Sequence, residues 1–426
     1  MSVYLLWFAL ALATPAQGPA EESLLRLEVR RLLHQLDAPT LAEREAAERK
    51  LIELGPRVLD YLPRDEQRWS AEVIQRSRRI RQVLQRQLAD EALRPSTVTL
   101  RAESMRLSEV LAEIQRQTGN KINTTVLWPR PAAPDPELAL SLSETPFWEA
   151  LDRVLDDARM AAELFGAEKA IYVRPPQPGQ APRSSRAVYV GPFRIEPIRM
   201  EAVRDLRTPE QRVLRVVLEI AWEPRLQPVS LRRLGKSLEA VDDRGNRLAG
   251  PDSGEVEIPV IPTVLATEVP VLLKLPPREA TQVARLRGGL AALVPGPVET
   301  FRFAELDEKA RNVERRIGAT TVTLERIRRN ADLWELRVAV RFEQAGDALA
   351  SHYNWILDSE AYLEASGQEP VQPAAMDTIR RSENEIGFSY LFAVDGALAD
   401  YGFVYKTPIA ILAREYEFEL GELPLP

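Results

Sequence analysis

The sequence predicts a multidomain protein of the α+β and all-β classes. We expect an N-terminal helical hairpin region, a small βαββαββ-type domain and two tandem antiparallel β-sandwich domains that are Ig-like in the broad sense. The 426 residues exceed what one ordinary hydrophobic core serves. Apolar residues recur at helical spacing over 22–94. From residue 187 onward they form short alternating runs that turn residues separate, as in β-sandwiches.

The first element is an uncharged apolar run, Val3–Ala13. Small residues at Thr14 and Ala16 suit cleavage before Gln17, which predicts a signal peptide at 1–16 and an exported protein, periplasmic or extracellular. No Lys or Arg precedes the run, so a buried N-terminal helix is the alternative. Later segments lack the roughly 20 consecutive apolar residues that a membrane span needs, so we expect no membrane span.

A helical region follows at 22–94. Thr40 and Glu43 match a capping box, in which the threonine hydroxyl accepts a hydrogen bond from the first turn and the glutamate reaches back. Gly55-Pro56 ends this helix. A long helix is then expected over 66–93.

The long helix carries a run of arginines: Arg76, Arg78, Arg79, Arg81 and Arg86. Such a run can form a basic patch for an anionic partner, and Arg78 and Arg81 are its candidate binding residues. The alternative is a helix face that simply contacts solvent.

The spacing of apolar residues changes over 97–174. A strand–helix–strand order occurs twice here, and one further strand completes the domain. This order predicts a small α+β sandwich. Its expected elements are strands at 98–100, 121–125, 138–142, 161–164 and 170–173, and helices at 105–118 and 146–159.

Two segments of this domain, Val98–Gly119 and Leu138–Leu151, resemble the short N-terminal domains of secretins and TonB-dependent receptors. The resemblance implies an extracytoplasmic protein-interaction module. No barrel or secretin pore segment follows in this sequence, so the receptor role is not implied. The stretch 38–55 resembles the HEAT-like helical pairs of secreted planctomycete proteins. The full domain order is similar to uncharacterised proteins of that group, which implies envelope localisation and no activity.

A Pro/Ser linker is expected at 175–186, before β-sandwiches at 187–306 and 317–426. The first sandwich has a strand with one apolar side: Leu214, Val216, Leu218, Ile220 and Trp222. The second has a matching strand: Trp334, Leu336, Val338, Val340 and Phe342.

The two β-rich segments are also related in pattern. Each alternating strand precedes a turn-bearing ribbon, at 238–248 and 358–368, and each segment has a similar ending, at 301–306 and 416–420. We therefore expect a duplication, with the charged segment 307–316 as the connector.

Composition argues against several function classes. The net charge of −7 argues against a dedicated nucleic-acid binder. The absence of cysteine removes disulfides, thiolate nucleophiles and zinc–thiolate sites. The two histidines, His34 and His352, fall in different expected domains, which leaves little metal or acid–base chemistry. No nucleophile elbow, Walker A loop, dinucleotide-binding glycine motif or HExxH motif occurs, and we expect no cofactor.

Three arrangements that resemble active or metal sites have simpler interpretations. Ser351-His352 is the only local start of a triad, and a polar cleft joining His352 to an acid and a hydroxyl would indicate catalysis. A glycosidase needs only two carboxylates, but 63 acidic residues make no pair specific. Residues 242–246 (Asp-Asp-Arg-Gly-Asn) offer oxygens to calcium, and a β-turn explains them equally.

Aromatic residues beside His352 are a second binding candidate. Tyr353 and Trp355, if exposed, can stack on a sugar ring or pack against a protein partner. The alternative is that Trp355 belongs to a buried strand.

These observations predict a non-catalytic, extracytoplasmic interaction or scaffolding protein of the cell envelope. Its expected partner is an envelope protein of unknown identity, and we expect no binding to nucleic acid. One alternative is a carbohydrate-binding protein that holds a polysaccharide with Tyr353 and Trp355. The other is a carboxylate-dependent hydrolase.

Overall fold

The structure, a computed structural model, describes residues 19–63, 69–123, 135–166, 168–179, 181, 183–184, 186–204, 206–208, 212–248, 250, 254–304, 306–394 and 397–426. The expected signal peptide at 1–16 lies outside these ranges. The described residues contain five α-helices and many antiparallel strands in several sheets, so the prediction of a mixed, mostly β, multidomain chain is confirmed at that level. Within these ranges, every helix is too short or too polar to cross a lipid bilayer.

The chain divides into two compact units between Leu88 and Ala89. The first unit is helical and begins with α1 (Pro19–Gln35), α2 (Leu41–Glu53) and the 3₁₀ helix η1 (Pro56–Asp60), before α3 (Ala71–Ala92). Its core consists of buried aliphatic residues from all of these helices, among them Val29, Leu32, Leu51, Val58, Ile80 and Leu84.

The start of α2 follows the expected capping pattern in part. The Thr40 hydroxyl oxygen accepts a hydrogen bond from the Glu43 backbone N–H at 3.3 Å. The Glu43 carboxylate accepts from the Thr40 hydroxyl at 2.7 Å, where a full capping box would have it accept from the Thr40 backbone N–H. Gly55, with φ of 78°, stands after the helix in a conformation that favours glycine.

Each expected element of the α+β domain at 97–174 has a counterpart with shifted ends, and residues 124 and 125 of the strand expected at 121–125 lie outside the described residues. The strand β1 pairs with β3, and β2, β5 and β4 form a second small sheet, in which β2 and β5 are parallel. The elements are β1 (Thr97–Arg106), α4 (Leu107–Thr118), β2 (Ile122–Asn123), β3 (Glu137–Pro146), α5 (Phe147–Ala158), β4 (Ala161–Glu163) and β5 (Ile171–Arg174).

This domain shares its hydrophobic core with the β-structure that follows. One continuous cluster of buried side chains contains Leu111 and Leu151 of the α+β domain and Phe193 and Trp222 of the next strands. The Trp148 indole N–H, on α5, donates to the Pro192 carbonyl at 3.2 Å. The segment 175–186, expected as a linker, therefore connects two sets of strands that share one hydrophobic core.

The next β-structure, which we call the first β body, has two four-stranded antiparallel sheets. Their strand orders are β10-β9-β12-β21 and β11-β8-β7-β6. The strands are β6 (Val188–Val190), β7 (Phe193–Arg204), β8 (Arg212–Trp222), β9 (Ser230–Asp242), β10 (Val256–Ile258), β11 (Ala266–Lys274), β12 (Gln282–Pro295) and β21 (Ile411–Pro424).

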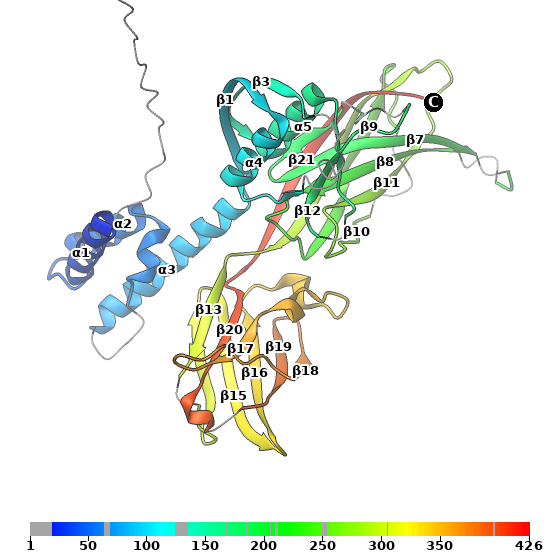
Figure 1. The fold of residues 1–426 in the computed structure, drawn as a ribbon. Coiled ribbons are helices and arrows are strands. Elements are labelled where there is room, and N and C mark those ends of the chain that lie inside the picture. The colour runs from blue at the N-terminus through cyan, green and yellow to red at the C-terminus, as the bar shows by residue number, and fades with distance from the viewer. Residues whose placement is uncertain are drawn as a thin grey trace, which may run out of the picture. The chain divides into compact units, whose positions relative to one another are not determined.

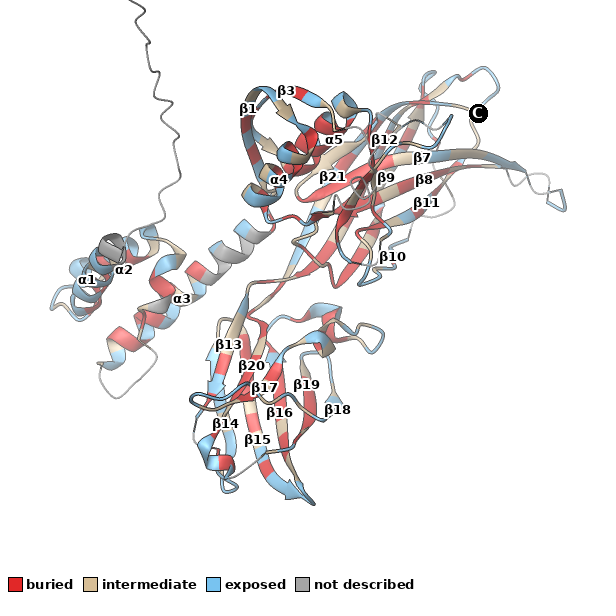
Figure 2. Cartoon of the chain, in the orientation of Figure 1, coloured by how far each residue is buried: buried red, intermediate tan, exposed pale blue. Residues whose placement is uncertain are grey.

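The second β body has sheets of five and three strands, β14-β15-β16-β19-β18 and β13-β20-β17. Buried residues run along the strands of both β bodies (Figure 2). The strands are β13 (Val298–Phe303), β14 (Arg311–Ile317), β15 (Thr320–Asn330), β16 (Leu333–Phe342), β17 (Ala361–Glu364), β18 (Ala375–Arg381), β19 (Glu385–Phe392) and β20 (Gly402–Pro408), with 3₁₀ turns η3 (Gly346–Leu349), η4 (Trp355–Asp358) and η5 (Leu398–Asp400).

The two β bodies are not in tandem, which corrects the boundaries expected at 187–306 and 317–426. The last strand, β21, pairs along its length with β12 and completes the first β body (Figure 1). β13, expected to end the first sandwich, pairs with β20 in the second β body. The second β body is therefore inserted between β12 and β21. The segment 301–306, expected to end the first sandwich, lies in the second β body, and the segment 416–420, expected to end the second sandwich, lies in the first β body.

The expected connector at 307–316 is largely a strand. β14 pairs with β15 and forms one edge of the five-stranded sheet. Most of its side chains are exposed. Charged residues are common on edge strands, because they discourage pairing with another chain. The charges that suggested a connector are therefore those of an edge strand.

Two short chain segments join the β bodies, and they are hydrogen-bonded to each other. The Gly296 N–H donates to the Ala410 carbonyl at 2.8 Å, and the Ile409 N–H donates to the Pro297 carbonyl at 3.0 Å. The chain therefore leaves and re-enters the first β body side by side, as a two-stranded ribbon.

Candidate binding cavity

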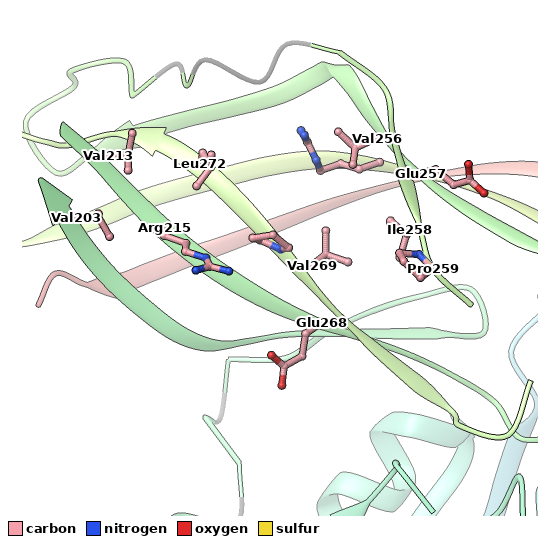
Figure 3. A pocket seen from close by; sticks show the side chains of 12 residues that line it. Val203, Val213, Arg215, Val256, Glu257, Ile258, Pro259, Glu268, Val269 and Leu272 are labelled. Carbon is pink, nitrogen blue, oxygen red and sulfur yellow. The ribbon is translucent and has the colours of Figure 1, made fainter. Parts of the chain in front are cut away.

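A cavity of about 440 Å³ lies in the first β body, beside the outermost strands of its two sheets, β10 and β11. Figure 3 shows labelled side chains from β7, β8, β10 and β11 around it. Volumes of roughly 300–1,000 Å³ are typical of small-molecule sites. Most of the lining is apolar: Val203, Val213, Val256, Ile258, Pro259, Val269, Pro270 and Leu272.

The sheet register brings these distant residues together. On one sheet, Val203 of β7 is opposite Val213 of β8, and Arg215 of β8 is opposite Leu272 of β11. On the other sheet, Val256 of β10 is opposite Arg233 of β9. The cavity therefore depends on five strands from both sheets.

Arg233 is the unusual residue in this lining. Its side chain is only 3% exposed, and it shares a face of β9 with the fully buried Leu231, two residues earlier. Among the described residues, no acceptor forms a hydrogen bond with its Nε or Nη1, both of which are buried. An unpaired buried charge costs several kcal/mol of stability, so this guanidinium provides an unused site for an anion.

The other charged residues of the lining do have partners. Glu268 pairs with Arg199 at 3.4 Å, and Arg215 lies 3.8 Å from Glu201. The Glu257 carboxylate accepts from the Tyr353 hydroxyl, which holds the pKa of Glu257 below its usual value. Of the lining charges, Arg233 alone is left without a counter-ion within the described part of the chain.

Two of the apolar residues that line the cavity are also exposed at the surface. Val203 and Val256 are 42% and 40% exposed. The cavity therefore presents part of its apolar lining to solvent, as binding surfaces commonly do.

A second, polar cavity of about 500 Å³ lies where the α+β domain meets the first β body. Its buried Arg194 pairs with three carboxylates: Asp152 of α5 at 2.8 Å, Glu219 of β8 at 3.1 Å, and Glu196. Burial raises the pKa of Glu219 to about 7, and the attraction of Arg194 offsets this only in part. The cluster links α5 of the α+β domain to β7 and β8, and Asp152 is also paired with Arg183 at 3.7 Å. Its acids are thus held by arginines and are not the open carboxylate pair that a glycosidase requires.

His352 does meet an acid and a hydroxyl, but in an arrangement unsuited to catalysis. Its Nε2 lies 3.0 Å from Glu257 Oε1, and the Tyr353 hydroxyl donates to the same oxygen. In a catalytic triad the hydroxyl bonds the imidazole, whereas here both groups bond the carboxylate. The imidazole and the carboxylate are also exposed, so no deep cleft encloses them.

Tyr353 and Trp355, the aromatic candidates, are half-buried on the second β body. The Trp355 indole N–H donates to the Ala348 carbonyl at 2.7 Å, and its ring packs on Phe342. Trp355 lies in the 3₁₀ turn η4 and not in the buried strand that was the alternative. The Tyr353 ring also contacts the His352 ring, with 4.0 Å between the ring centroids.

The arginine candidates, Arg78 and Arg81, lie on α3 in the first compact unit, whereas Tyr353 and Trp355 belong to the second. Arg78 is exposed on α3. Arg81 donates to the carbonyl oxygens of Leu59 and Leu62, at 3.4 and 3.2 Å, and thereby ties α3 to the end of η1. Its guanidinium has a structural role.

The candidate calcium loop at 242–246 is a turn. Asp242 Oδ1 accepts from the backbone N–H groups of Arg244 and Asn246, at 2.9 and 2.8 Å. The carboxylate is thus engaged by the turn itself. Across the described ranges, no group of three acidic or histidine side chains is placed to hold a metal ion.

The sequence did not single out Arg233, because the adjacent Arg232 is an equally good candidate for the buried position. Ser-Leu-Arg-Arg-Leu at 230–234 places two arginines in succession in an apolar strand. Alternation shows that one of them must face the core, but the sequence does not show which. The pair of arginines was the available signal.

Comparison with known proteins identifies no relative. No protein-family model, no curated protein and no solved structure matches this chain. The resemblances to secretin-type and HEAT-like domains therefore remain predictions.

Proposed function

We propose that this chain is a non-catalytic binding protein of the cell envelope, exported from the cytoplasm, and that it binds its partner at the cavity of the first β body. The observation that carries the proposal is Arg233, a buried arginine that has no counter-ion among the described residues and stands in a mostly apolar lining. Binding of an anionic group at this guanidinium would offset the free-energy cost of burying its charge.

A scaffolding role for the rest of the chain agrees with the contacts of its buried charged residues, which join one domain to another. Glu223, which is fully buried, accepts from the Ser96 N–H at 2.9 Å and from the Ser96 hydroxyl at 2.7 Å. The same carboxylate bonds Asn120 and Arg225. Together with the Arg194 cluster, this network fixes the α+β domain on the first β body. Buried polar groups here hold domains together, which supports a binding role over a catalytic one.

The envelope location is proposed from the sequence. The apolar run ending in small residues at 1–16 supports export, and the resemblance of 97–174 to secretin-type domains supports an extracytoplasmic site of action. Fractionation of the native host, with protease added to intact and to permeabilised cells, tests this part. Protection from protease after release of the envelope contents would place the chain in the cytoplasm and contradict the proposal.

The binding role is tested by affinity capture from envelope fractions. The bait is the chain from residue 17 on, as wild type, Arg233→Met and Arg287→Met. Arg287 is the control because it is exposed and paired with Glu419 at 2.7 Å, on β12 and β21. Proteins, polysaccharides and small molecules in the eluates are all analysed.

We expect wild type and Arg287→Met to retain a component that Arg233→Met loses by at least about tenfold, the effect of some 1.4 kcal/mol. Equal recovery by all three baits would exclude this cavity as the binding site. Recovery of a polysaccharide that depends on Tyr353 and Trp355, and not on Arg233, would favour the carbohydrate-binding alternative.

A further inference from the structure

We infer that the cavity binds one monocarboxylate with an unbranched apolar chain, a molecule of the fatty-acid type, and that its carboxylate pairs with Arg233. This inference rests on the binding role proposed above and specifies the chemical class of the ligand. Four features of the lining lead to it.

The first feature is the anion site. The Arg233 guanidinium is buried, and among the described residues neither Nε nor Nη1 has an acceptor. A guanidinium matches the planar geometry of a carboxylate, which can accept two parallel hydrogen bonds from it. Burial strengthens that pairing because little water competes for it.

The second feature limits the ligand to one negative charge. Arg233 provides one uncompensated positive charge, since Arg215 already lies near Glu201. Two carboxylates, Glu257 and Glu268, also line the cavity and repel additional negative charge. A phosphate monoester, which carries close to two charges at neutral pH, fits this balance less well than a carboxylate does.

The third feature is the apolar remainder of the lining. Eight aliphatic or proline side chains from β7, β8, β10, β11 and the residue after β10 make up most of it. The charged groups other than Arg233 are already paired, so they offer little to a polar substituent. An apolar chain gains binding free energy with each methylene that it buries here.

The fourth feature argues against an extended peptide as the ligand. Pro270 lies in the middle of β11, and Pro259 directly follows β10, which has only three residues. Proline on an edge strand removes a hydrogen-bond donor and discourages addition of a further strand. The two edges beside the cavity are therefore poor templates for a peptide strand, whereas an acyl chain requires no backbone hydrogen bonds.

The test is calorimetric titration of the purified chain with three probes of equal chain length, the two anions kept below their micellar concentrations and the alcohol below its solubility limit. The probes are dodecanoate, uncharged dodecanol and dodecyl phosphate. The proteins are wild type, Arg233→Met, Arg233→Lys and the control Arg287→Met. Arg233→Met should fold at least as well as wild type, because it replaces an unpaired buried charge with an apolar side chain of similar length. Circular dichroism and the melting temperature check this.

We expect dodecanoate to bind wild type at one site, at least about tenfold more tightly than either other probe, a difference of roughly 1.4 kcal/mol. Arg233→Met should lose this preference and bind dodecanol at least as well as dodecanoate. Arg233→Lys should keep part of the preference, because it retains the charge without the planar fork. Arg287→Met should behave as wild type.

Two results would overturn the inference: no saturable binding of dodecanoate to wild type, or a preference for dodecanoate that persists in Arg233→Met. Tighter binding of dodecyl phosphate would overturn the single-charge argument. These failures differ from failure of the proposed function. If the capture experiment recovers an Arg233-dependent protein or polysaccharide while dodecanoate does not bind, the binding role stands and the ligand class is wrong.

Discussion

Two buried arginines of the first β body have opposite surroundings. Arg194 bonds three carboxylates, whereas Arg233 has no hydrogen-bonding acceptor at Nε or Nη1 among the described residues. Burial raises the pKa of Glu219 to about 7, because the loss of solvation outweighs the attraction of Arg194 and the nearby Glu196 adds repulsion. A pH dependence of stability follows from this carboxyl.

The folded-state pKa of Glu219 lies above its unfolded value, so the folded protein binds the extra proton. Its stabilising contribution is therefore complete below about pH 4.5 and is lost as the pH rises through 7. From the difference between the two pKa values, we expect this carboxyl to lower the free energy of unfolding by up to about 3 kcal/mol between pH 4.5 and 8. Glu219→Gln should remove that component and be more stable than wild type at pH 8.

Urea unfolding of both proteins from pH 4.5 to 8 measures this difference. Glu239→Gln is the control, because Glu239 is exposed on β9 of the same body. Parallel pH profiles for wild type and Glu219→Gln would show that Glu219 does not carry the expected proton.

The residue scale is also where sequence reasoning reached its limit. It identified the side chains that build cores, such as Leu218, Trp222, Val338 and Phe342, because their alternation is local. It could not place Arg233, Glu219 or Glu223, since the burial of a charged side chain depends on partners distant in sequence. Arg233, which carries the proposed function, is one of these residues.

At the scale of elements, the pairing of β12 with β21 depends on a glycine. Gly288 is opposite Phe418, and a Cβ at position 288 would lie 2.5 Å from the Phe418 ring. The bare backbone of Gly288 thus leaves room for the ring, and Phe418 is buried there. Glycine–aromatic pairs across neighbouring strands stabilise sheets in this way.

We therefore expect Gly288→Ala to destabilise the protein by about 1–3 kcal/mol through the clash with the ring. Phe418→Ala should cost about 3–5 kcal/mol. In the Phe418→Ala background the alanine at 288 should cost almost nothing, which gives a coupling energy of at least about 1 kcal/mol. Urea denaturation of the four proteins measures it.

Gly387→Ala is the matched control, because Gly387 lies on β19 of the second β body and its nearest neighbours are Ile379 and Arg380. Its effect should add to that of Phe418→Ala without coupling. If Gly288 and Phe418 also behaved additively, the C-terminal strand would not lie on β12.

The elements themselves were largely predictable, because helix and strand periods are local. α4, α5, β8 and β16 appear where the apolar pattern places them. The sheet to which a strand belongs is not a local property. β13 and β21 have alternating patterns that suit either β body, and only the packed structure assigns them. This is why the tandem boundaries were wrong while the strands were right.

For the whole molecule, insertion of the second β body makes it removable. Pro295 and Ile411 are opposite each other at the ends of β12 and β21. We expect a chain in which Asn-Gly replaces 296–410 to close as a β-hairpin and to fold, because this turn suits two adjacent antiparallel strands. Near-ultraviolet circular dichroism and a single cooperative urea transition should report a folded first β body.

The comparison is a chain ended at Pro295, the last residue of β12, which lacks both the second β body and β21. It should fail to fold or should aggregate, since it leaves β12 as an open edge and loses the buried Phe418, Leu420 and Leu423. Equal stability of the two shortened chains would show that β21 is not needed by the first β body.

The position of β21 also sets the order in which the parts of the chain can mature. A polypeptide is made from its N-terminus, and domains fold as units as they emerge. The inserted body is complete once β20 has been made, whereas its host still waits for the strand that covers β12. The second β body can therefore complete its folding before the first β body does, and the last step is the docking of the C-terminal strand β21 on β12. Until then, the apolar surface that Phe418 and Leu420 will cover is open to chaperones and to aggregation.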